Sequence, residues 1–220
     1  MLFRSMKFWD ISRTLSNDIA HWPGDTPFQF QLTGKIAEGS AVNLGAIKTS
    51  VHNGTHADAR FHFETDGETI EKVPLEVYMG RAVVVDLGET FVRSSEKHLI
   101  TTEDLRPHSE EIAETLRLLI KTGRWSDSEI FPNQIPVISA DVPGWLQKNG
   151  VKLLGLDLPS VDEVDSKSLP NHHALARAGI AIIESLDLKN VGAGIYNLVA
   201  LPLKIAGGDA APLRAVLWRD

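Results

Sequence analysis

Three histidines and an aspartate fall within eleven consecutive residues, at His52, His56, Asp58 and His62, in a chain of 220 residues that has 8 histidines and no cysteine. Without thiolates, any metal site must use nitrogen and oxygen ligands, and neutral imidazole and carboxylate are the usual ligands of zinc, manganese or iron. Asp58 has two oxygens and could bridge two ions, while His62 could remain free for proton transfer. This segment therefore predicts a metal or catalytic site.

The backbone between these residues is expected to be a loop. His52 and His56 are four residues apart, which on a helix would place them on one face. Asn53-Gly54 between them is a turn signal, so we expect a loop that wraps around a cation, reached by a strand over Val42 to Val51. Any one of these histidines could instead be an ordinary hydrogen-bonded residue, but three beside an aspartate favour a functional site.

A second group of polar residues lies downstream, at His172, His173 and Glu184. His172 could be no more than a polar helix start, and Glu184 no more than a solvated strand end. Glu184, however, follows the apolar run Ile180-Ala181-Ile182-Ile183, and a carboxylate at the end of a buried strand is costly unless it is paired or bound to a metal. Glu184 therefore joins the candidate site residues.

An aromatic residue near the N-terminus is a candidate for substrate binding. Trp22-Pro23-Gly24-Asp25 has Pro and Gly at the two central positions of a type II turn, and a tryptophan beside such a turn could stack on an aromatic substrate or anchor the core. His21, His98 and His108 lie in no ligand-like spacing and are interpreted as surface or structural residues.

The second half of the chain predicts alternating helices and strands. Ser139 or Asp141 could cap a helix over residues 143–149 that Gly150 ends, and Asn171 could cap another over 172–178 that Gly179 ends. Periodicity alone does not decide whether 116–121 is helical or extended. Short apolar runs predict strands at Ala82 to Leu87, Val151 to Leu156, Ile180 to Glu184, Tyr196 to Leu203 and Leu213 to Trp218.

Composition excludes several classes of protein. Hydrophobic residues make up 43% and charged residues 23% of the chain, which is typical of a globular protein. A formal net charge of −7 disfavours nucleic acid as a partner. No apolar run is long enough for a membrane span, and residues 1–6 lack the apolar segment of a signal peptide. We expect a single domain over residues 1–220. We also expect it in the cytoplasm, because a chain without cysteine has no disulfides and the cytoplasm is a reducing compartment.

The sequence His52-Asn53-Gly54-Thr55-His56-Ala57-Asp58, with His62 four residues on, resembles the signature of the metal-dependent cyclase family. Within that family the resemblance is strongest to the branch that hydrolyses aryl formamides. The likeness runs almost end to end, in the same order, through Asp10-Ile11-Ser12, Trp22 to Phe28, the histidine segment, Gly155 to Asp162, His172-His173-Ala174 with Glu184, and Leu201-Pro202-Leu203.

The resemblance implies a binuclear site for two divalent ions per subunit, Zn²⁺ or alternatively Mn²⁺ or Co²⁺. His52, His56 and Asp58 would hold one ion, and Asp58 would bridge to a second. His172, preferred to His173 for its spacing, and Glu184 would hold that second ion.

The resemblance also implies roles for two further residues. His62 would donate and accept the proton, and Trp22 would bind the aryl ring. The implied reaction is hydrolysis of N-formyl-L-kynurenine to L-kynurenine and formate in tryptophan degradation.

The fold implied by the resemblance is α/β, a swivelling β/β/α-type domain with a sheet-built core and flanking helices, in a homodimer. Residues 116–121 then become a strand. The chain departs from the family at Arg60, where members commonly have proline. Proline would stiffen the segment between Asp58 and His62, whereas arginine is expected to loosen it and add a cation near the pocket or its mouth.

Three alternatives to this function remain. A serine-dependent formamidase would need the pentapeptide Gly-x-Ser-x-Gly, which the chain lacks. A member of the same family could act on another aryl or cyclic amide such as isatin, because the histidine segment is shared. A non-catalytic metal-binding module is the third, although structural zinc sites are usually closed and rich in thiolates.

Overall fold

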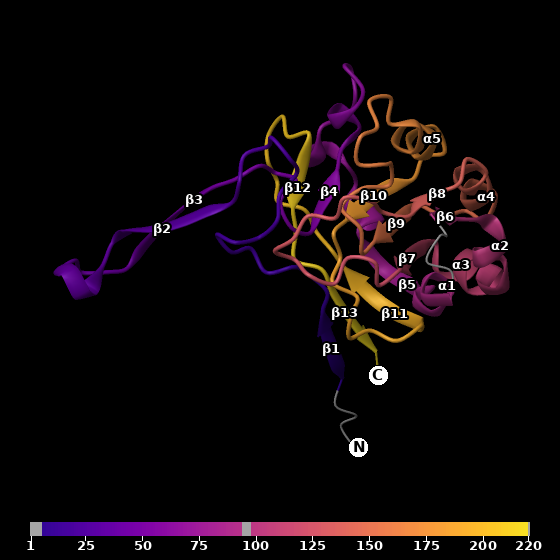
Figure 1. Ribbon diagram of the computed structural model, residues 1–220, viewed down its shortest axis with the longest axis horizontal. Helices are drawn as coiled ribbons and strands as arrows, with labels where there is room; N and C mark the ends of the chain where they lie inside the picture. The colour runs from indigo at the N-terminus through magenta and orange to yellow at the C-terminus, as the bar shows by residue number, and fades with distance from the viewer. Residues whose placement is uncertain (1–5, 94–97, 220) are drawn as a thin grey trace.

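A curled mixed sheet forms the centre of the protein in the computed structural model, which describes residues 6–93 and 98–219 (Figure 1). No signal peptide is predicted in residues 1–6, and residues 1–5 of this stretch lie outside the described residues. Nine strands of the described chain form this sheet, in the order β1 (Lys7–Asp10), β13 (Val216–Arg219), β11 (Gly194–Val199), β5 (Met79–Asp86), β7 (Arg117–Lys121), β9 (Leu153–Leu156), β10 (Ala181–Glu184), β4 (His56–Asp58) and β12 (Ala210–Pro212).

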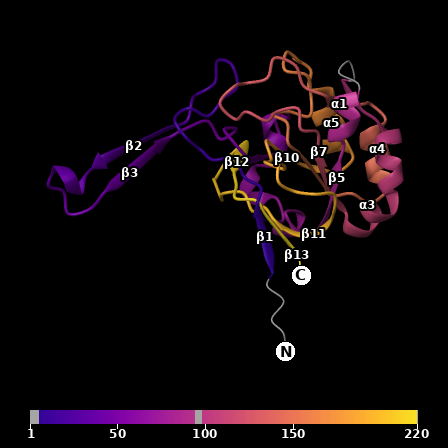
Figure 2. The same ribbon diagram turned by 60° about the horizontal axis from the view of Figure 1, so that its bottom comes forward.

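The middle of the sheet is parallel and its two sides are antiparallel. Strands β5, β7, β9 and β10 run parallel to one another. On one side β4 and β12 pair antiparallel, and on the other the first and last strands, β1 and β13, pair with each other (Figure 2). Around the sheet lie the short helices α1 (Gly88–Arg93), α2 (Thr102–Leu105), α3 (Ser109–Thr115), α4 (Val142–Lys148) and α5 (Pro170–Arg177), the 3₁₀ turns η2 (Arg60–His62), η3 (Ile70–Lys72), η4 (Leu75–Val77) and η5 (Arg106–His108), and a parallel pair, β6 (Leu99–Ile100) and β8 (Val137–Ile138). One further 3₁₀ turn, η1 (Ile36–Glu38), connects strands β2 (Gln29–Gly34) and β3 (Leu44–Lys48), away from the sheet.

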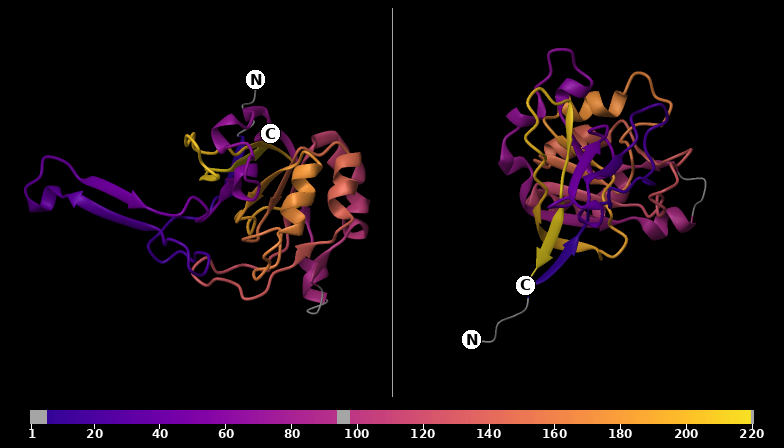
Figure 3. Two further views of the ribbon diagram at one scale, coloured as in Figure 1. Left: turned by 90° about the horizontal axis from the view of Figure 1, so that it is seen from above. Right: turned by 90° about the vertical axis from the view of Figure 1, so that its left-hand side faces the viewer.

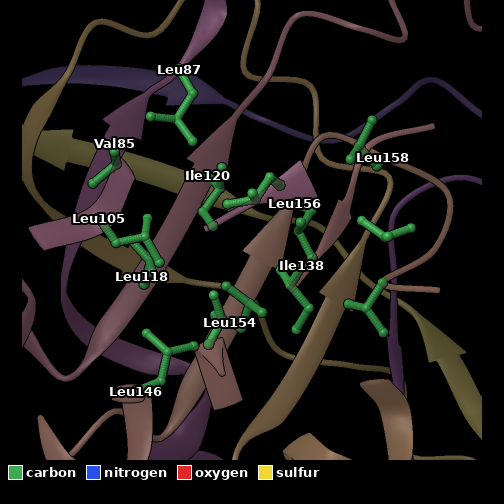
Figure 4. Packing of buried hydrophobic residues seen from close by; sticks show 14 of the residues in the cluster. Val85, Leu87, Leu105, Leu118, Ile120, Ile138, Leu146, Leu154, Leu156 and Leu158 are labelled. Atoms are coloured by element: carbon green, nitrogen blue, oxygen red, sulfur yellow. The ribbon is translucent and has the colours of Figure 1, made fainter. Parts of the chain in front are cut away.

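The central strands are buried on both faces, which explains their continuous apolar runs. Val83 and Val85 of β5 pack toward the helices, whereas Ala82 and Val84 pack into a second apolar cluster on the opposite face. This alternation follows from the period of two in a strand. On the helical face, strand residues such as Leu118, Ile120, Leu154 and Leu156 meet Leu105, Ile138 and Leu146 (Figure 4). The expected α/β architecture with a sheet-built core and flanking helices is confirmed.

The ambiguous segment 116–121 is a strand. Helix α3 ends at Thr115, and the next residue, Leu116, has a left-handed φ of 61°. Residues 117–121 then pair with β5 and β9. Of the other expected strands, 196–203 is shorter than predicted, since β11 ends at Val199. Pro202, which has no N–H to donate, makes only an isolated bridge to Leu213.

The helix over 143–149 is confirmed as α4, and Gly150 follows it with a φ of 74°. The prediction for the next helix was wrong in one respect, because Asn171 lies inside α5 and does not cap it. The side-chain amide of Asn171 donates instead to the carbonyls of Ile138 and Val161. The carboxylate of Asp162 accepts the Asn171 and His172 N–H groups at 2.9 and 3.1 Å, and so satisfies the start of the helix from outside.

A two-stranded arm projects from the body. Strands β2 (Gln29–Gly34) and β3 (Leu44–Lys48) form this antiparallel hairpin, which extends away from the helices (Figure 3). The expected strand over 42–51 is therefore present but shorter, and it belongs to this arm. Across residues 6–93 and 98–219, no helix has the length and apolar composition needed to cross a bilayer.

Candidate functional site

Two adjacent strands bring the first candidate ligands together. His56 and Asp58 lie on β4, two residues apart and hence on one face of the sheet. The antiparallel register places Glu184 of β10 opposite His56. The expectation of a loop through the whole segment was therefore wrong for its second half, because only residues 51–55 form turns and bends. A strand holds its side chains more firmly than a loop would.

The loop that carries His52 is fixed by its own motif residues. Gly54 has a φ of +65°, and a Cβ there would lie 2.6 Å from the side chain of Leu15, so this position requires glycine. The Thr55 hydroxyl donates to the Ser185 carbonyl at 2.6 Å and accepts the Arg13 N–H at 2.9 Å. These contacts attach the loop to the end of β10 beside Glu184.

The carboxylate of Asp58 lies between the histidines. Its Oδ1 is 3.2 Å from His52 Nδ1 and 3.4 Å from His56 Nε2, and its Oδ2 is 3.5 Å from His172 Nε2. Glu184 completes the cluster, with Oε1 3.6 Å from His172 Nε2 and Oε2 3.6 Å from His56 Nε2. Groups able to hold a metal ion thus include His52–His56–Asp58 and Asp58–His172–Glu184 within the described chain, and Asp58 is common to both.

The unsatisfied polar atoms of this cluster fit divalent ions. His56 Nε2 and both Asp58 oxygens are buried and have no hydrogen-bond partner in the described chain, which is costly unless something else is bound there. The other ring nitrogen of each candidate histidine ligand has a hydrogen-bond partner. His52 Nε2 faces Asp209 at 3.0 Å, His56 Nδ1 faces the Gly54 carbonyl at 2.9 Å and His172 Nδ1 faces Asp162 at 2.7 Å. Such outer partners are typical of metal-ligating histidines.

Charge pairing shifts the pKa values at the site. Burial disfavours the charged form of each histidine, but neighbouring carboxylates outweigh it and raise the pKa of His52 to about 9 and those of His56 and His172 to about 10. Burial alone would raise the pKa of Asp58, yet its contacts with His172, His52 and His56 hold it well below the usual value. Without a metal ion, these imidazoles therefore retain protons at neutral pH.

His62 lies on η2, beside the cluster but outside both ligand groups that contain Asp58. Its Nδ1 is 3.4 Å from Asp209 Oδ2, and its ring centre is 4.1 Å from that of His52. Burial lowers the pKa of His62, so the ring is neutral at pH 7 and able to accept a proton. About 33% of the His62 side chain is exposed, on the side of the pocket.

A pocket of about 290 Å³ opens over the cluster. Trp22 lines it together with Trp125 and Phe131, and the Trp22 and Phe131 rings meet edge to face with centroids 5.2 Å apart. Arg13 stacks on Trp125 at 3.8 Å and fixes that wall. His21, expected to be a surface or structural residue, also lines this pocket. The pocket therefore joins an aromatic wall to a floor of four histidines and the Glu184 carboxylate, made by His52, His56, His62, His172 and Glu184.

The structure also shows where His173 and Arg60 lie relative to the site. His173 packs its ring near Phe63, with centroids 5.4 Å apart, and belongs to none of the ligand groups. Arg60 was expected near the pocket or its mouth, which was wrong. Its guanidinium donates to the Ala176 carbonyl at the end of α5 and lines a separate cavity. There it complements the negative end of the helix dipole.

Sequence reasoning assigned no role to Asp162 and Asp209, the partners of His172 and His52. Asp162 lies in the segment Gly155 to Asp162 that carries part of the family resemblance, so a signal was present. Asp209 follows two glycines and lies 157 residues from His52. No local spacing in the sequence connects Asp209 with His52.

The fold and this site define a class of protein, the cyclase-fold hydrolases. A solved structure called a potential metal-dependent hydrolase with cyclase activity superposes with a TM-score of 0.78 and 29% identity, over 98% of this chain and all of that one. Isatin hydrolase A from Labrenzia aggregata has a TM-score of 0.81 over 97% of this chain and 93% of its own, at 23% identity. That second likeness concerns the fold alone.

The family model described as "Putative cyclase" matches residues 9–163. The chain belongs to this cyclase family, and the expected resemblance is confirmed. A protein of Geobacillus thermodenitrificans named kynurenine formamidase is 43% identical to it over 208 residues, which cover 94% of this chain and 95% of the relative.

Proposed function

We propose that this protein is a metal-dependent arylformamidase that hydrolyses N-formyl-L-kynurenine to L-kynurenine and formate. The observation that carries the proposal is one pocket in which a histidine–carboxylate cluster, a neutral histidine and an aromatic wall face the same space. The full-length likeness to a protein named kynurenine formamidase supports the choice of substrate. The reaction belongs to the breakdown of tryptophan.

Two divalent ions fit the donor set, one held by His52, His56 and Asp58, the other by Asp58, His172 and Glu184. This cysteine-free set suits Zn²⁺, with Mn²⁺ and Co²⁺ as alternatives. Such ions supply a water of lowered pKa and polarise the carbonyl oxygen of an amide. The side chains of these five residues would hold the ions at the floor of the pocket and leave its mouth for the substrate.

His62 moves the proton. In the hydrolysis, a water oxygen forms a bond to the formyl carbon and the bond from that carbon to the anilide nitrogen breaks. Neutral His62, with its lowered pKa, accepts one proton of the attacking water and returns it to the departing nitrogen, which leaves as a free arylamine. The other product is formic acid, which releases its proton to solvent and becomes formate. Trp22, with Phe131 beside it, packs against the aryl ring.

The two alternative functions, a cyclic-amide hydrolase and a non-catalytic metal-binding module, have less support. A cyclic amide such as isatin would use the same floor, and isatin hydrolase shares the fold at 23% identity. A non-catalytic metal module would have no need of a neutral histidine and an open pocket beside its ligands. We therefore retain N-formyl-L-kynurenine as the substrate and isatin as the competing compound in the test.

The test is turnover of N-formyl-L-kynurenine by the purified protein before chelation, after chelation and after addition of Zn²⁺, Mn²⁺ or Co²⁺. We expect hydrolysis that a chelator abolishes and a divalent ion restores, with isatin turned over at least about 100-fold less efficiently, or about 2.7 kcal/mol in transition-state binding. Turnover that survives complete metal removal would contradict the mechanism. A metal-loaded protein that opens isatin faster would contradict the substrate assignment.

We further propose that residues 1–220 are one domain and that it acts as a homodimer in the cytoplasm. One sheet joins the first and last strands, which supports the single domain. The arm supports the dimer, because Phe30 and Ile47 are directly paired across it and are 47% and 64% exposed. An isolated two-stranded hairpin is barely stable in water, and a second copy of the chain would cover this face.

A further inference from the structure

Asp209 lies between a candidate metal ligand and the candidate base. Its Oδ2 atom is 3.0 Å from His52 Nε2 and 3.4 Å from His62 Nδ1. The backbone fixes this position, because the Asp209 carbonyl accepts the Ala59 N–H at 2.9 Å and the next residue pairs with Asp58. Asp209 directly precedes β12, and its carboxylate thus lies beside two imidazoles, that of His52 in the loop and that of His62 on η2.

A carboxylate that accepts from both rings sets their tautomers. An ionised aspartate has no proton to donate, so each ring must present an N–H to it. With an ion in place of its second proton, His52 would carry its remaining proton on Nε2, and the lone pair of Nδ1, which lies 3.2 Å from Asp58 Oδ1, would be available to that ion. His62 carries its proton on Nδ1, which leaves the lone pair of Nε2 for exchange with a reacting group.

We propose that Asp209 is the positioning residue that holds His52 in the tautomer that binds metal and His62 in the tautomer that accepts a proton. The inference deepens the proposed function and rests on it for the role of His62. The other candidate ligands have partners of their own, since His56 uses the Gly54 carbonyl and His172 uses Asp162. Asp209 differs from these partners because it serves a ligand and the base together.

The first test is spectroscopic and needs no substrate. Protein labelled with ¹⁵N-histidine and loaded with Zn²⁺ should show His62 protonated at Nδ1 and unprotonated at Nε2. In Asp209→Ala the His62 signal should move toward the Nε2-protonated form, and Asp209→Glu should restore part of the wild-type pattern. An Nε2-protonated His62 in the wild-type protein, or a pattern that Asp209→Ala leaves unchanged, would overturn the proposal.

The second test measures metal binding. Asp209→Ala should weaken Zn²⁺ binding about 10- to 100-fold in competition with a chromophoric chelator, the usual effect of removing an outer partner of a ligand. The exposed Asp66 provides a matched control, and Asp66→Asn should bind Zn²⁺ as the wild type does. His52, His62 and Asp209 could themselves hold an ion. A count of three ions per subunit that falls to two in Asp209→Ala would make Asp209 a ligand and overturn the proposal.

The third test is kinetic and measures the energetic coupling between Asp209 and His62. At saturating metal, Asp209→Ala should lower kcat about 10- to 100-fold with little change in KM, and it should lower kcat no further in a His62→Ala background. Asp162→Asn, whose side chain contacts His172 instead, should show an additive effect in that background. Fully additive losses for Asp209→Ala would overturn the coupling. If N-formyl-L-kynurenine is not a substrate, the first two tests still decide the role of Asp209.

Discussion

At the scale of single residues, the site is a set of imidazoles whose two nitrogens have different partners. His56 and His172 each direct Nε2 at carboxylates of the cluster and Nδ1 at an outer acceptor, whereas His52 uses its nitrogens in the reverse order. Among the described ion pairs His62 makes none with Asp58, and burial lowers the pKa of His62. The chain therefore separates residues that could hold ions from the one that the proposed mechanism uses for proton exchange.

His62→Ala tests this separation. We expect kcat to fall about 10²- to 10⁴-fold, the usual contribution of a positioned general acid–base residue, because no proton acceptor then faces the substrate. The metal content should remain that of the wild type, since both ligand groups around Asp58 are intact. Steady-state kinetics and elemental analysis on the same sample measure the two quantities. Loss of metal together with activity would instead place His62 among the ligands.

The raised pKa values of the metal-free site predict how its stability depends on pH. The folded-state pKa values of His52, His56 and His172 are about 9 to 10, above the ordinary value of about 6.5. The stabilisation from the charged pairs is therefore complete below about pH 6.5 and is lost as the pH rises through 9 to 10. The thermal midpoint of the chelated protein should fall across this window.

The metal-loaded protein is the control for this prediction. Bound ions replace the protons on the three imidazoles, so its thermal midpoint should fall much less over the same range, and metal affinity should rise with pH. Differential scanning calorimetry at pH 6.5, 8 and 9.5 compares the two forms. A midpoint of the chelated protein that stays level or rises relative to the loaded protein would refute the assigned charge pairs.

At the scale of elements, two strand pairings and one 3₁₀ turn assemble the site. The pairing of β4 with β10 sets His56 opposite Glu184, and the pairing of β4 with β12 sets Ala210 opposite Asp58 and so places Asp209. The turn η2 adds His62 directly after β4. This turn approaches the following loop closely, because a Cβ on Gly67 would lie 2.4 Å from the Arg60 carbonyl carbon and 2.5 Å from the Phe61 nitrogen.

Gly67→Ala should therefore disturb η2. A methyl group cannot fit against rigid backbone, so we expect the free energy of unfolding to fall by about 1–3 kcal/mol and kcat to fall with the displacement of His62. Gly144→Ala in α4 is the matched control, since nothing lies within 4 Å of its Cβ position. That substitution should stabilise the helix by about 0.5–1 kcal/mol and leave kcat unchanged. Urea denaturation and kinetics measure both, and equal effects of the two variants would contradict this account.

At the scale of the whole molecule, the arm and the site are connected through the chain. Strand β3 ends at Lys48, and the histidine loop begins within the next four residues. Phe30, Leu32 and Ile47 share one exposed face of the arm, 40–64% exposed. Contiguous exposed apolar side chains of this kind mark interaction surfaces. Pairing of two chains through the arm would therefore also steady the segment that leads to His52.

Ile47→Glu tests the proposed dimer. A carboxylate placed in the apolar contact should weaken association by about 3 kcal/mol, or about 100-fold in Kd. Val92→Glu is the matched control, because Val92 is 83% exposed on α1, away from the arm. Sedimentation velocity should show a dimer for the wild type and Val92→Glu, and a monomer for Ile47→Glu at micromolar concentration. A monomeric wild type, or a dimer that Ile47→Glu leaves intact, would refute an interface on the arm.

The sequence by itself determined the family, the α/β architecture and the types of residue at the site. Local patterns were sufficient for these features, because ligand chemistry depends on residue type and strand burial appears as a continuous apolar run. The helix over 143–149 and the strand over 82–87 were predictable for the same reason. Periodicity left 116–121 undecided, and the family resemblance was needed to assign it to a strand.

Only the tertiary structure decided which residues meet. Strand pairing set His56 and Asp58 on β4, where a loop was expected, and the guanidinium of Arg60 donates to the Ala176 carbonyl at the end of α5, away from the pocket. Asp162 displaced Asn171 as the helix cap, and β12 brought Asp209 to His52 across 157 residues. Register and packing are properties of the whole sheet, and their energy is shared among distant residues. No local window of the sequence contains that information.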